Sequence, residues 1–510
     1  MSLTSGAGTD QARVPPEVIE TRDPRTDTLL AVVPDQPAHE VRSAVARARA
    51  VAPVWAAAGP RQRRDHLLAV RDRLIDRAEL LTETIVAETG KQPAEALTTE
   101  LMAVCETIEW YARNAERVLA DRAVAPGTLA HKRAWVRHEP LGVVGVISPW
   151  NYPFTLSMTP LVSALFAGNA VVLKPSEVTP TVGLAIAELF DDDRWGNLVQ
   201  VVTGGGATGE ALVRSGVDKV VFTGSVATGK RVMAAAADTL TPVLLELGGK
   251  DPMIVCADAD VERAARGAVW GAFQNSGQTC MSVERVYVER AVADEFIRRV
   301  VVLTGDIRHG GSGGDIGSMT FAPQVDVVEA HLADAVGKGA RVLVGGSRIE
   351  RRGLWFEPTV VVDVDHRMDL MTEETFGPVL PIMVVDDAEE ALRLANDSRY
   401  GLNSSVWTGD RARGEDLAAR IQAGNVCIND CIVSYAICGL PFGGVKESGI
   451  GRVHGPEGLL EFTATKSVMA PRFAVPREPW WFPVPRHLDR LAVLGMRLRF
   501  RRRRVRSSHS

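Results

Sequence analysis

The feature that most constrains this sequence is an alternation of short apolar runs, helical patterns and glycine turns that begins after Leu141. The runs include GVVGVIS, NAVVLKP, KVVFTGS, PVLLELGG and PMIVC, and later RVYVE, VLPIMVV and SSVWTG. They are rich in β-branched residues and have no regular polar face, which is typical of parallel strands that helices cover on both sides. The pattern predicts an α/β protein with one such unit before about residue 250 and a second from there to about 440.

The N-terminal part of the chain has a different texture. Residues 1–20 are expected to form a loose arm, and about 36 to 120 to form helices, because Val41, Val45 and Ala48 recur at helical spacing. The apolar stretch from Phe154 to Val172 is broken by Thr, Ser, Pro, Gly and Asn, so we expect a buried helix and strand there instead of a membrane span.

Length and composition limit the class of protein. A chain of 510 residues predicts two to four structural units, and 46% hydrophobic with 24% charged residues is ordinary for a globular protein. No apolar secretory leader precedes the six cysteines, and no CxxC pair or other metal-ligand spacing is present. We therefore expect reduced thiols, no metal and a cytoplasmic protein.

The C-terminal tail differs in charge from the rest of the chain. From Arg486 onward it has nine arginines and one aspartate, a charge of +8 in a chain whose total is −5, so the remainder carries −13. Trp480, Trp481 and Phe482 precede leucines at helical spacing. Packing of the aromatic residues on a partner subunit and peripheral binding to an anionic membrane surface both fit this pattern. Nucleic-acid binding is not expected, because the acidic body would repel phosphates.

Three residues stand in settings that suit covalent chemistry. Cys280, in QNSGQTCMS, follows small polar residues and would be a nucleophile if its surroundings lowered its pKa. Glu246, between an apolar strand and a Gly-Gly turn, would become a general base if burial raised its pKa. Asn151 is fixed between Pro149 and Pro153 and could donate to an oxyanion. Taken alone, each has an ordinary alternative: a small buried cysteine, an acid at a strand end, or an asparagine in a turn.

Further residues follow strand ends, where open α/β sheets bind nucleotides. Lys174 and Glu177 come after NAVVL, and both could bond to a ribose. Gly224 and Ser225 stand at a strand-to-helix turn whose backbone N–H groups suit a diphosphate.

Together these residues resemble the aldehyde dehydrogenase superfamily over about residues 20 to 470. The motifs occur in the family's order: PWN (149–151), KPSE (174–177), FTGS (222–225), ELGGK (246–250), GQTC (277–280), EETFGP (373–378) and PFGGVKESGIGR (441–452). Parts of the chain are also similar to a bacterial group named as succinic semialdehyde dehydrogenases.

The resemblance implies a role for each residue. Cys280 would be the nucleophile, Asn151 and the Cys280 N–H the oxyanion hole, and Glu246 the base that activates water. The implied coenzyme contacts are Trp150, Lys174, Ser176 and Glu177 at the adenosine, Gly224 and Ser225 at the diphosphate, and Glu374 and Phe376 at the nicotinamide ribose and ring. The aldehyde would pass through a thiohemiacetal and a thioester to the acid.

The resemblance also implies the domains and the assembly. A Rossmann-type nucleotide-binding domain is expected over 1–121 and 144–246, and an α/β catalytic domain over 247–465. A β-rich oligomerisation flap is expected over 122–143 and 466–486, with a basic amphipathic tail at 487–510. Homodimers or homotetramers are the expected assemblies.

The substrate and the coenzyme stay open at this point. Better-known semialdehyde dehydrogenases have an arginine where this chain has Thr159, so a hydrophobic or aromatic aldehyde is favoured and succinic semialdehyde is the alternative. Glu177 favours NAD, and Lys174 with Ser176 would allow NADP. A Glu at position 246 argues for hydrolysis over acyl transfer to coenzyme A, and the presence of Cys280 and Glu246 argues against a non-catalytic scaffold.

Overall fold

The computed structural model describes residues 17–191, 194–310, 313–473 and 475–500, which form two compact units. The larger unit comprises the described residues up to 120 together with 138–464, and the smaller one comprises 121–137 with the described residues from 465 onward. The predicted arm at 1–16 and the end of the basic tail at 501–510 lie outside the described residues. The expectation of a loose arm is wrong for residues 18–20, because strand β1 (Val18–Asp23) pairs there with β2 (Thr28–Pro34).

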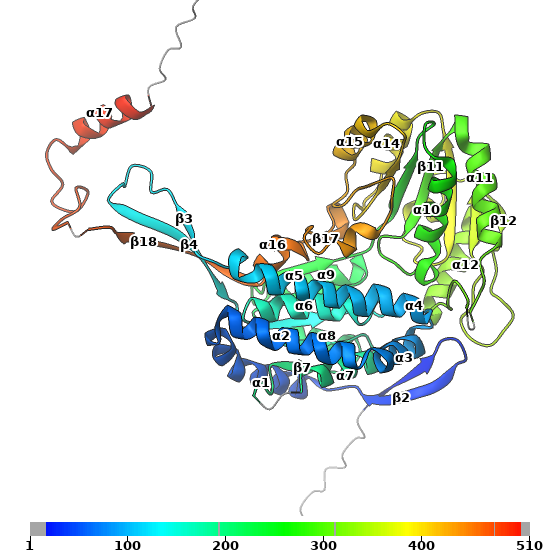
Figure 1. Cartoon of the computed structure of the whole chain (residues 1–510), viewed down its shortest axis with the longest axis horizontal. Coiled ribbons are helices and arrows are strands. Elements are labelled where there is room, and N and C mark those ends of the chain that lie inside the picture. Colours follow the sequence, from blue (N-terminus) through cyan, green and yellow to red (C-terminus); the bar gives the residue numbers. More distant parts are fainter. Residues whose placement is uncertain (1–16, 192–193, 311–312, 474, 501–510) are drawn as a thin grey trace, which may run out of the picture. The chain divides into compact units, whose positions relative to one another are not determined.

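The first sheet of the larger unit is the predicted N-terminal α/β sheet (Figure 1). Its strands are, in spatial order, β17 (Gly449–Ile450), β9 (Val243–Glu246), β8 (Lys219–Thr223), β5 (Val143–Ile147), β6 (Ala170–Lys174) and β7 (Val199–Val201). All neighbours are parallel except β17, which runs antiparallel to β9. The carboxyl ends of β5, β6, β8 and β9 therefore meet at one edge, which places the PWN, KPSE, FTGS and ELGGK motifs there.

Helices cover this sheet because its strands are apolar throughout. The helices are α1 (Ala38–Ala57), α2 (Gly59–Asp76), α3 (Ala78–Thr89), α5 (Ala103–Val118), α6 (Thr155–Phe166), α7 (Pro180–Leu189), α8 (Gly206–Val213) and α9 (Val226–Ala237). Helices α1 and α8 pack together and on β6, and α6 packs on β5 and β6 beneath α2 and α5. Nearly all side chains of α6 and all those of β6 are buried, as the apolar stretch predicts. None of the helices in the described ranges has the length and apolar character that a membrane span requires.

The second sheet is the predicted C-terminal α/β unit. Its strands are, in spatial order, β12 (Arg341–Val344), β13 (Thr359–Val362), β14 (Val379–Val385), β11 (Val283–Glu289), β10 (Asp251–Val255), β15 (Ser405–Trp407) and β16 (Cys427–Ile428). Only the β12–β13 pair is antiparallel. Met253 and Val255 join one apolar core and Ile254 joins another on the opposite face, as the two-residue period of a strand requires. The two-sheet α/β architecture predicted from the sequence is confirmed.

Helices and short turns complete the second half of the larger unit. They are α10 (Val261–Phe273), α11 (Arg290–Gly305), α12 (Ala322–Gly337), α13 (Asp369–Thr372), α14 (Ala388–Asn396), α15 (Arg411–Arg420) and α16 (Gly455–Leu460), with 3-10 turns η2 (Gln274–Gly277), η3 (Val433–Ala436) and η4 (Lys446–Ser448). Between α3 and α5 the chain forms α4 (Pro93–Glu95) and a π-helical turn, η1 (Ala96–Met102), of the kind often found at functional sites.

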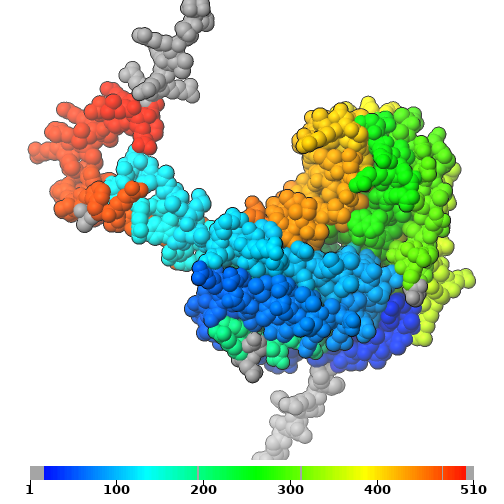
Figure 2. Space-filling model, in the orientation of Figure 1, coloured from blue at the N-terminus to red at the C-terminus, as the bar shows by residue number. Residues whose placement is uncertain are grey.

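The smaller unit is built on a three-stranded sheet of β3 (Arg122–Val124), β4 (Lys132–Pro140) and β18 (Thr463–Pro471), in the order β18-β4-β3. Figure 2 shows its cyan and orange-to-red segments packed together. Glu478 fastens the segment after β18, because it bonds to His131 (2.9 Å) and to Lys132. Helix α17 (Leu488–Phe500) follows, at the leucines that have helical spacing, and buries none of its side chains.

Candidate active site

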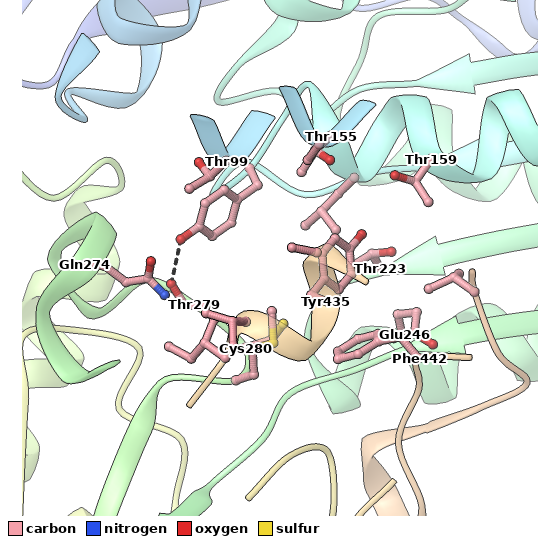
Figure 3. A pocket seen from close by; sticks show the side chains of 18 of the residues that line it. Thr99, Thr155, Thr159, Thr223, Glu246, Gln274, Thr279, Cys280, Tyr435 and Phe442 are labelled. Carbon is pink, nitrogen blue, oxygen red and sulfur yellow. Dashed lines mark hydrogen bonds between the residues drawn. The ribbon is translucent and has the colours of Figure 1, made fainter. Parts of the chain in front are cut away.

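Cys280 and Glu246 lie on a wall that separates two cavities of the larger unit. The first, the apolar cavity, has a volume of about 250 Å³. The second, the polar cavity, has a volume of about 490 Å³. Five residues line both: Leu156, Thr223, Glu246, Leu247 and Cys280. A group bound to Cys280 is therefore accessible from both cavities. Figure 3 shows the apolar cavity, with Cys280 and Glu246 among its lining side chains.

The surroundings of Cys280 raise its pKa. Burial raises the pKa of the thiol well above its usual value of 9.0, and the carboxyl groups of Asp251, Glu246 and Glu374 raise it further. A lowered pKa was the condition for a nucleophilic Cys280, and the surroundings that the chain itself provides do not meet it. The carboxyl groups come from three separate segments, so the local sequence QNSGQTCMS could not reveal them. These surroundings favour the thiol form of Cys280 over the thiolate.

Glu246 is buried at the end of β9. Its Oε1 atom has no hydrogen-bond partner among the described residues, and burial raises its pKa well above 4.5. The nearby Arg452 opposes that rise and Glu461 adds to it. This is the perturbed carboxyl group that the sequence predicts at this position, and a raised pKa suits a general base that works near neutral pH.

Asn151 lies at the end of β5, beside the loop that carries Cys280. One of the two N–H groups of its side-chain amide donates to the carbonyl oxygen of Gln278 at 2.9 Å, and the other takes no part in that bond. Asn275 donates to the backbone carbonyl oxygen of Asn151 at 2.9 Å. The next residue, Tyr152, bonds through its hydroxyl to Thr279 at 2.9 Å. These bonds join the PWN and GQTC loops, so Asn151 is held close to Cys280.

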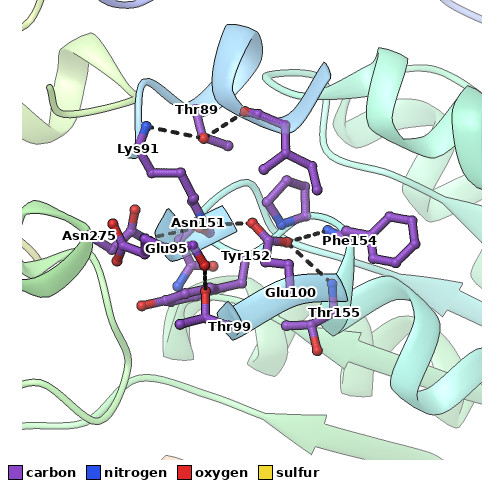
Figure 4. A network of polar contacts seen from close by, with 12 residues as sticks. Thr89, Lys91, Glu95, Thr99, Glu100, Asn151, Tyr152, Phe154, Thr155 and Asn275 are labelled. Atoms are coloured by element: carbon purple, nitrogen blue, oxygen red, sulfur yellow. Dashed lines mark hydrogen bonds and ion pairs between the residues drawn. The ribbon is translucent and has the colours of Figure 1, made fainter. Parts of the chain in front are cut away.

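A buried ion pair that the sequence did not predict, between Lys91 and Glu100, supports the loop that carries Asn151 (Figure 4). Lys91 donates to the Asn151 carbonyl oxygen (2.9 Å) and pairs with Glu100 at 2.5 Å. The other oxygen of Glu100 accepts from the backbone N–H groups of Phe154 (2.7 Å) and Thr155 (3.3 Å). Neither charged side chain is exposed to solvent. Charged residues on a helical pattern predict a solvated face, so no local pattern could have identified this pair.

Glycines allow three of the motifs to approach one another closely. A Cβ on Gly248 would lie 2.1 Å from a carboxylate oxygen of Glu374, and Gly249 donates its N–H to Glu374 at 3.2 Å. Gly277, at a φ of 74°, would place a Cβ 2.1 Å from the Gly377 carbonyl oxygen. The GQTC and FGP segments therefore pack backbone against backbone, and the GG turn packs against the Glu374 side chain. Loss of solvent in this packing raises the pKa of the half-buried Glu374 to about 8.

The polar cavity brings together most of the predicted coenzyme residues. Trp150, Asn151, Gly224, Ser225, Glu374 and Phe376 line it together with Cys280 and Glu246. Phe376 has a φ of 50°, an uncommon conformation for a bulky residue, and its ring meets that of Trp150 edge to face with centroids 5.4 Å apart. Ser225 caps α9 by accepting from the Thr228 N–H at 3.3 Å, so the helix N-terminus faces the cavity.

The remaining predicted residues, Lys174, Ser176 and Glu177, do not line either cavity. Lys174 is the last residue of β6, the neighbour of β5, and Ser176 and Glu177 follow it at the same edge of the sheet. Lys174 and Ser176 are buried, Lys174 pairs with Glu177 at 3.0 Å, and Ser176 accepts from the Val178 N–H at 3.2 Å. The Glu177 side chain is half exposed.

The apolar cavity lies on the side of Cys280 and Glu246 that faces α6 and the segment after β16. Besides the five shared residues it is lined by Thr98, Thr99, Ala103, Tyr152, Thr155, Thr159, Pro160, Val221, Trp270, Gln274, Thr279, Met281, Ile432, Val433, Tyr435, Ala436, Phe442 and Val453. Among these lining residues there is no Lys, Arg or His. Cys427, Cys431 and Cys438 are not among them either, so the lining comes from their neighbours.

The matching family model is that of the aldehyde dehydrogenase family, which covers residues 11–468. A Methylomonas sp. protein named 4,4'-diapolycopene aldehyde oxidase is 45% identical over 90% of this chain and 87% of its own length. A Mycobacterium ulcerans protein, whose name contains the words succinate-semialdehyde dehydrogenase and NADP(+), is 39% identical over 88% of this chain and 87% of its own.

Solved structures agree with these relatives. The crystal structure of a Mycobacterium tuberculosis aldehyde dehydrogenase complexed with NAD+ is 36% identical, has a TM-score of 0.85, and covers 93% of this chain and 98% of that one. An E. coli NADP-dependent enzyme is 35% identical with a TM-score of 0.85, and covers 89% of this chain and 95% of that one. The chain belongs to the aldehyde dehydrogenase family, and it is an oxidoreductase that acts on aldehydes.

Proposed function

We propose that this protein oxidises an apolar aldehyde to the carboxylic acid through a covalent intermediate on Cys280, with NAD as the preferred coenzyme. The observation that carries the proposal is the position of Cys280 and Glu246 on the wall between an apolar and a polar cavity. An aldehyde in the apolar cavity and a coenzyme in the polar cavity would then meet at the same sulfur.

The residues of the polar cavity fit a dinucleotide. Its volume of about 490 Å³ lies in the usual range of ligand pockets. The N-terminus of α9 with Gly224 and Ser225 would bind the diphosphate, helped by Lys230 and Arg399 on the same lining. Glu374 and Phe376 would hold the nicotinamide ribose and ring. Since Trp150 packs on Phe376, we assign it to this end of the coenzyme and revise the adenosine role expected from the sequence.

The chain's own residues would perform the covalent chemistry. The Cys280 thiol first gives its proton to solvent water. Its sulfur then bonds to the aldehyde carbon, and the carbonyl oxygen becomes an oxyanion that accepts from Asn151 and from the Cys280 N–H. When bound, NAD(P) supplies the hydride acceptor that converts this thiohemiacetal into a thioester. Glu246 then takes a proton from water, whose oxygen attacks the thioester carbon, and the acid leaves as the sulfur recovers its proton. Glu246 favours this hydrolysis over transfer to coenzyme A.

The coenzyme preference rests on Glu177. Its half-exposed carboxylate would accept from the 2′-hydroxyl of NAD and repel the 2′-phosphate of NADP. The ion pair with Lys174 weakens that repulsion, because the ammonium lies 3.0 Å from the carboxylate oxygen. We therefore propose NADP as the alternative, less preferred coenzyme.

The lining of the apolar cavity favours an uncharged substrate over succinic semialdehyde. A carboxylate inside it would face threonine, tyrosine and alkyl groups with no basic partner on the lining, and burying an unpaired charge costs several kcal/mol. The name of the Methylomonas relative, 4,4'-diapolycopene aldehyde oxidase, contains an aldehyde and no carboxylate, which agrees with an uncharged substrate.

We further propose a homodimer or homotetramer, with the smaller unit as the contact between copies. Its apolar side chains are exposed at Met469, Phe473, Trp480, Trp481 and Phe482. The division of the larger unit into nucleotide-binding and catalytic domains at residues 246 and 247, and the binding of the tail to an anionic membrane surface, stay predictions from the sequence.

The test is a panel of aldehydes assayed by the absorbance of the reduced coenzyme, each with NAD and with NADP. We expect kcat/KM for hexanal and benzaldehyde to exceed that for succinic semialdehyde by at least about 100-fold, since about 3 kcal/mol of lost binding has that effect. A preference for succinic semialdehyde would contradict the proposed substrate class and leave the family assignment intact.

A further inference from the structure

A third cavity adjoins the apolar cavity on the side away from the polar cavity. We name it the adjoining cavity, and its volume is about 530 Å³. Four residues, Thr98, Thr99, Trp270 and Gln274, line both it and the apolar cavity. Figure 3 shows Thr99 and Gln274 at the end of the apolar cavity opposite Glu246. A chain that starts at Cys280 and leaves between these residues would enter the adjoining cavity.

The walls of the adjoining cavity are mostly hydrocarbon. Helices α10 and α11 pack together and contribute Val269, Phe273 and Leu303, and Ile307 follows α11. Trp270, which lines both cavities, is 45% exposed, although tryptophan is usually well buried.

The polar groups around the adjoining cavity are not set to bind a charge. Arg266 pairs with Glu262 at 2.6 Å, and Asp315 pairs with Arg308 at 2.8 Å. The third charged residue, Glu95, is half-buried, and loss of solvent around its carboxyl group raises its pKa. The cavity therefore offers an apolar surface with neutral or already paired polar groups at its edge.

The volume of the apolar cavity limits what it can hold by itself. About 250 Å³ is below the usual range for a pocket that holds a whole organic ligand. An aldehyde longer than this cavity must continue past Trp270, and the adjoining cavity lies in that direction.

We propose that the adjoining cavity binds the distal hydrocarbon part of a long-chain aldehyde whose carbonyl group lies at Cys280, and that Trp270 is the boundary residue between the two parts of the chain. This inference rests on the proposed function and narrows it to long, unbranched or polyene aldehydes. Each methylene group buried beyond Trp270 would increase kcat/KM about fourfold.

The experiment measures kcat/KM for hexanal, decanal and hexadecanal with a blocking variant and a matched control. Ala94→Trp places a large side chain in the adjoining cavity from an exposed position that does not line the apolar cavity. Leu97→Trp adds the same side chain three residues away, at an exposed position that lines neither cavity. We expect Ala94→Trp to lower kcat/KM for hexadecanal at least tenfold and leave hexanal unchanged, and Leu97→Trp to change neither.

A second pair of variants, at Leu303 and Val302, tests the inference at a different position from Ala94. Leu303→Asp puts a charge on the wall of the adjoining cavity, and Val302→Asp puts the same charge on the solvent side of α11, where Val302 is 61% exposed. Only Leu303→Asp should remove the advantage of hexadecanal over hexanal. If wild-type protein oxidises hexanal but gains nothing with chain length, or if both blocking variants keep the gain, the inference is overturned and the proposed function stands. If hexanal and decanal are not oxidised at all, the proposed function itself has failed.

Discussion

The ammonium of Lys91 lies 2.9 Å from the backbone carbonyl oxygen of Asn151 and also pairs with the buried carboxylate of Glu100. Two opposite charges without exposure are tolerated because each has the other as its partner. One carboxylate oxygen of Glu100 accepts from the Lys91 ammonium, and the other accepts from the N–H groups of Phe154 and Thr155. The pair thus fixes the backbone on which the proposed oxyanion donor stands.

Removing one partner of this pair should destabilise the protein strongly. Lys91→Met or Glu100→Gln leaves the other charge buried without its partner, which typically costs about 3–5 kcal/mol of unfolding free energy. The double variant removes both charges, so it should be more stable than Lys91→Met alone. Urea unfolding of the three variants checks this. Equal stability of all variants and the wild type would show that the pair does not hold the loop.

Cys280→Ala should abolish aldehyde oxidation while coenzyme binding stays near normal. The substitution removes the sulfur that forms the covalent bond and changes little else in the polar cavity. Coenzyme binding is followed by protein fluorescence and oxidation by reduced-coenzyme absorbance. Cys105→Ala, at a half-buried cysteine of α5 outside both cavities, is the matched control and should keep full activity. Retained turnover in Cys280→Ala would refute the mechanism.

Activity should rise with pH well into the alkaline range. Cys280 acts as the thiolate and Glu246 as the carboxylate, and burial raises the pKa of both groups above 9.0 and 4.5. A raised pKa means that the active, deprotonated form appears only at higher pH, so kcat/KM should still be increasing above neutrality. In Glu246→Gln the first hydride step should keep the part of this rise that belongs to Cys280. A profile flat from acidic to alkaline pH would contradict both assignments.

Glu177→Gln should shift the coenzyme preference toward NADP. The change removes the charge that repels a 2′-phosphate and releases Lys174, now 3.0 Å away, to pair with that phosphate. We expect the ratio of kcat/KM for NAD to that for NADP to fall about tenfold, as one such charge interaction would give. Glu188→Gln, an exposed change on α7, should leave the ratio unaltered. An unchanged ratio in Glu177→Gln would place the adenosine ribose elsewhere.

Much of the fold and of the site could be predicted because the controlling information is local. Continuous apolar runs such as VVGVI and AVVLK mark buried parallel strands, and their shared carboxyl edge brings Asn151, Gly224 and Glu246 together. The β1–β2 hairpin was missed because its strands are largely exposed and have no core pattern to mark them.

What could not be predicted depends on contacts between distant segments. The raised pKa of Cys280 comes from its burial and from carboxyl groups on other segments, and the burial of Lys91 and Glu100 comes from packing against the PWN loop. Likewise, Thr98, Trp270 and Gln274 share a boundary between two cavities although they come from two separate segments. A sequence gives the order of such residues along the chain but does not show that they lie together in the fold.

The most direct test of the central claim is to look for the acyl group on Cys280 in Glu246→Gln. With aldehyde and NAD, this variant should release a stoichiometric burst of reduced coenzyme and then stall, because the thioester forms but water is not activated. Mass spectrometry of the digested protein should find the acyl group on the peptide that contains Cys280. Normal steady-state turnover together with an unmodified Cys280 would contradict the account.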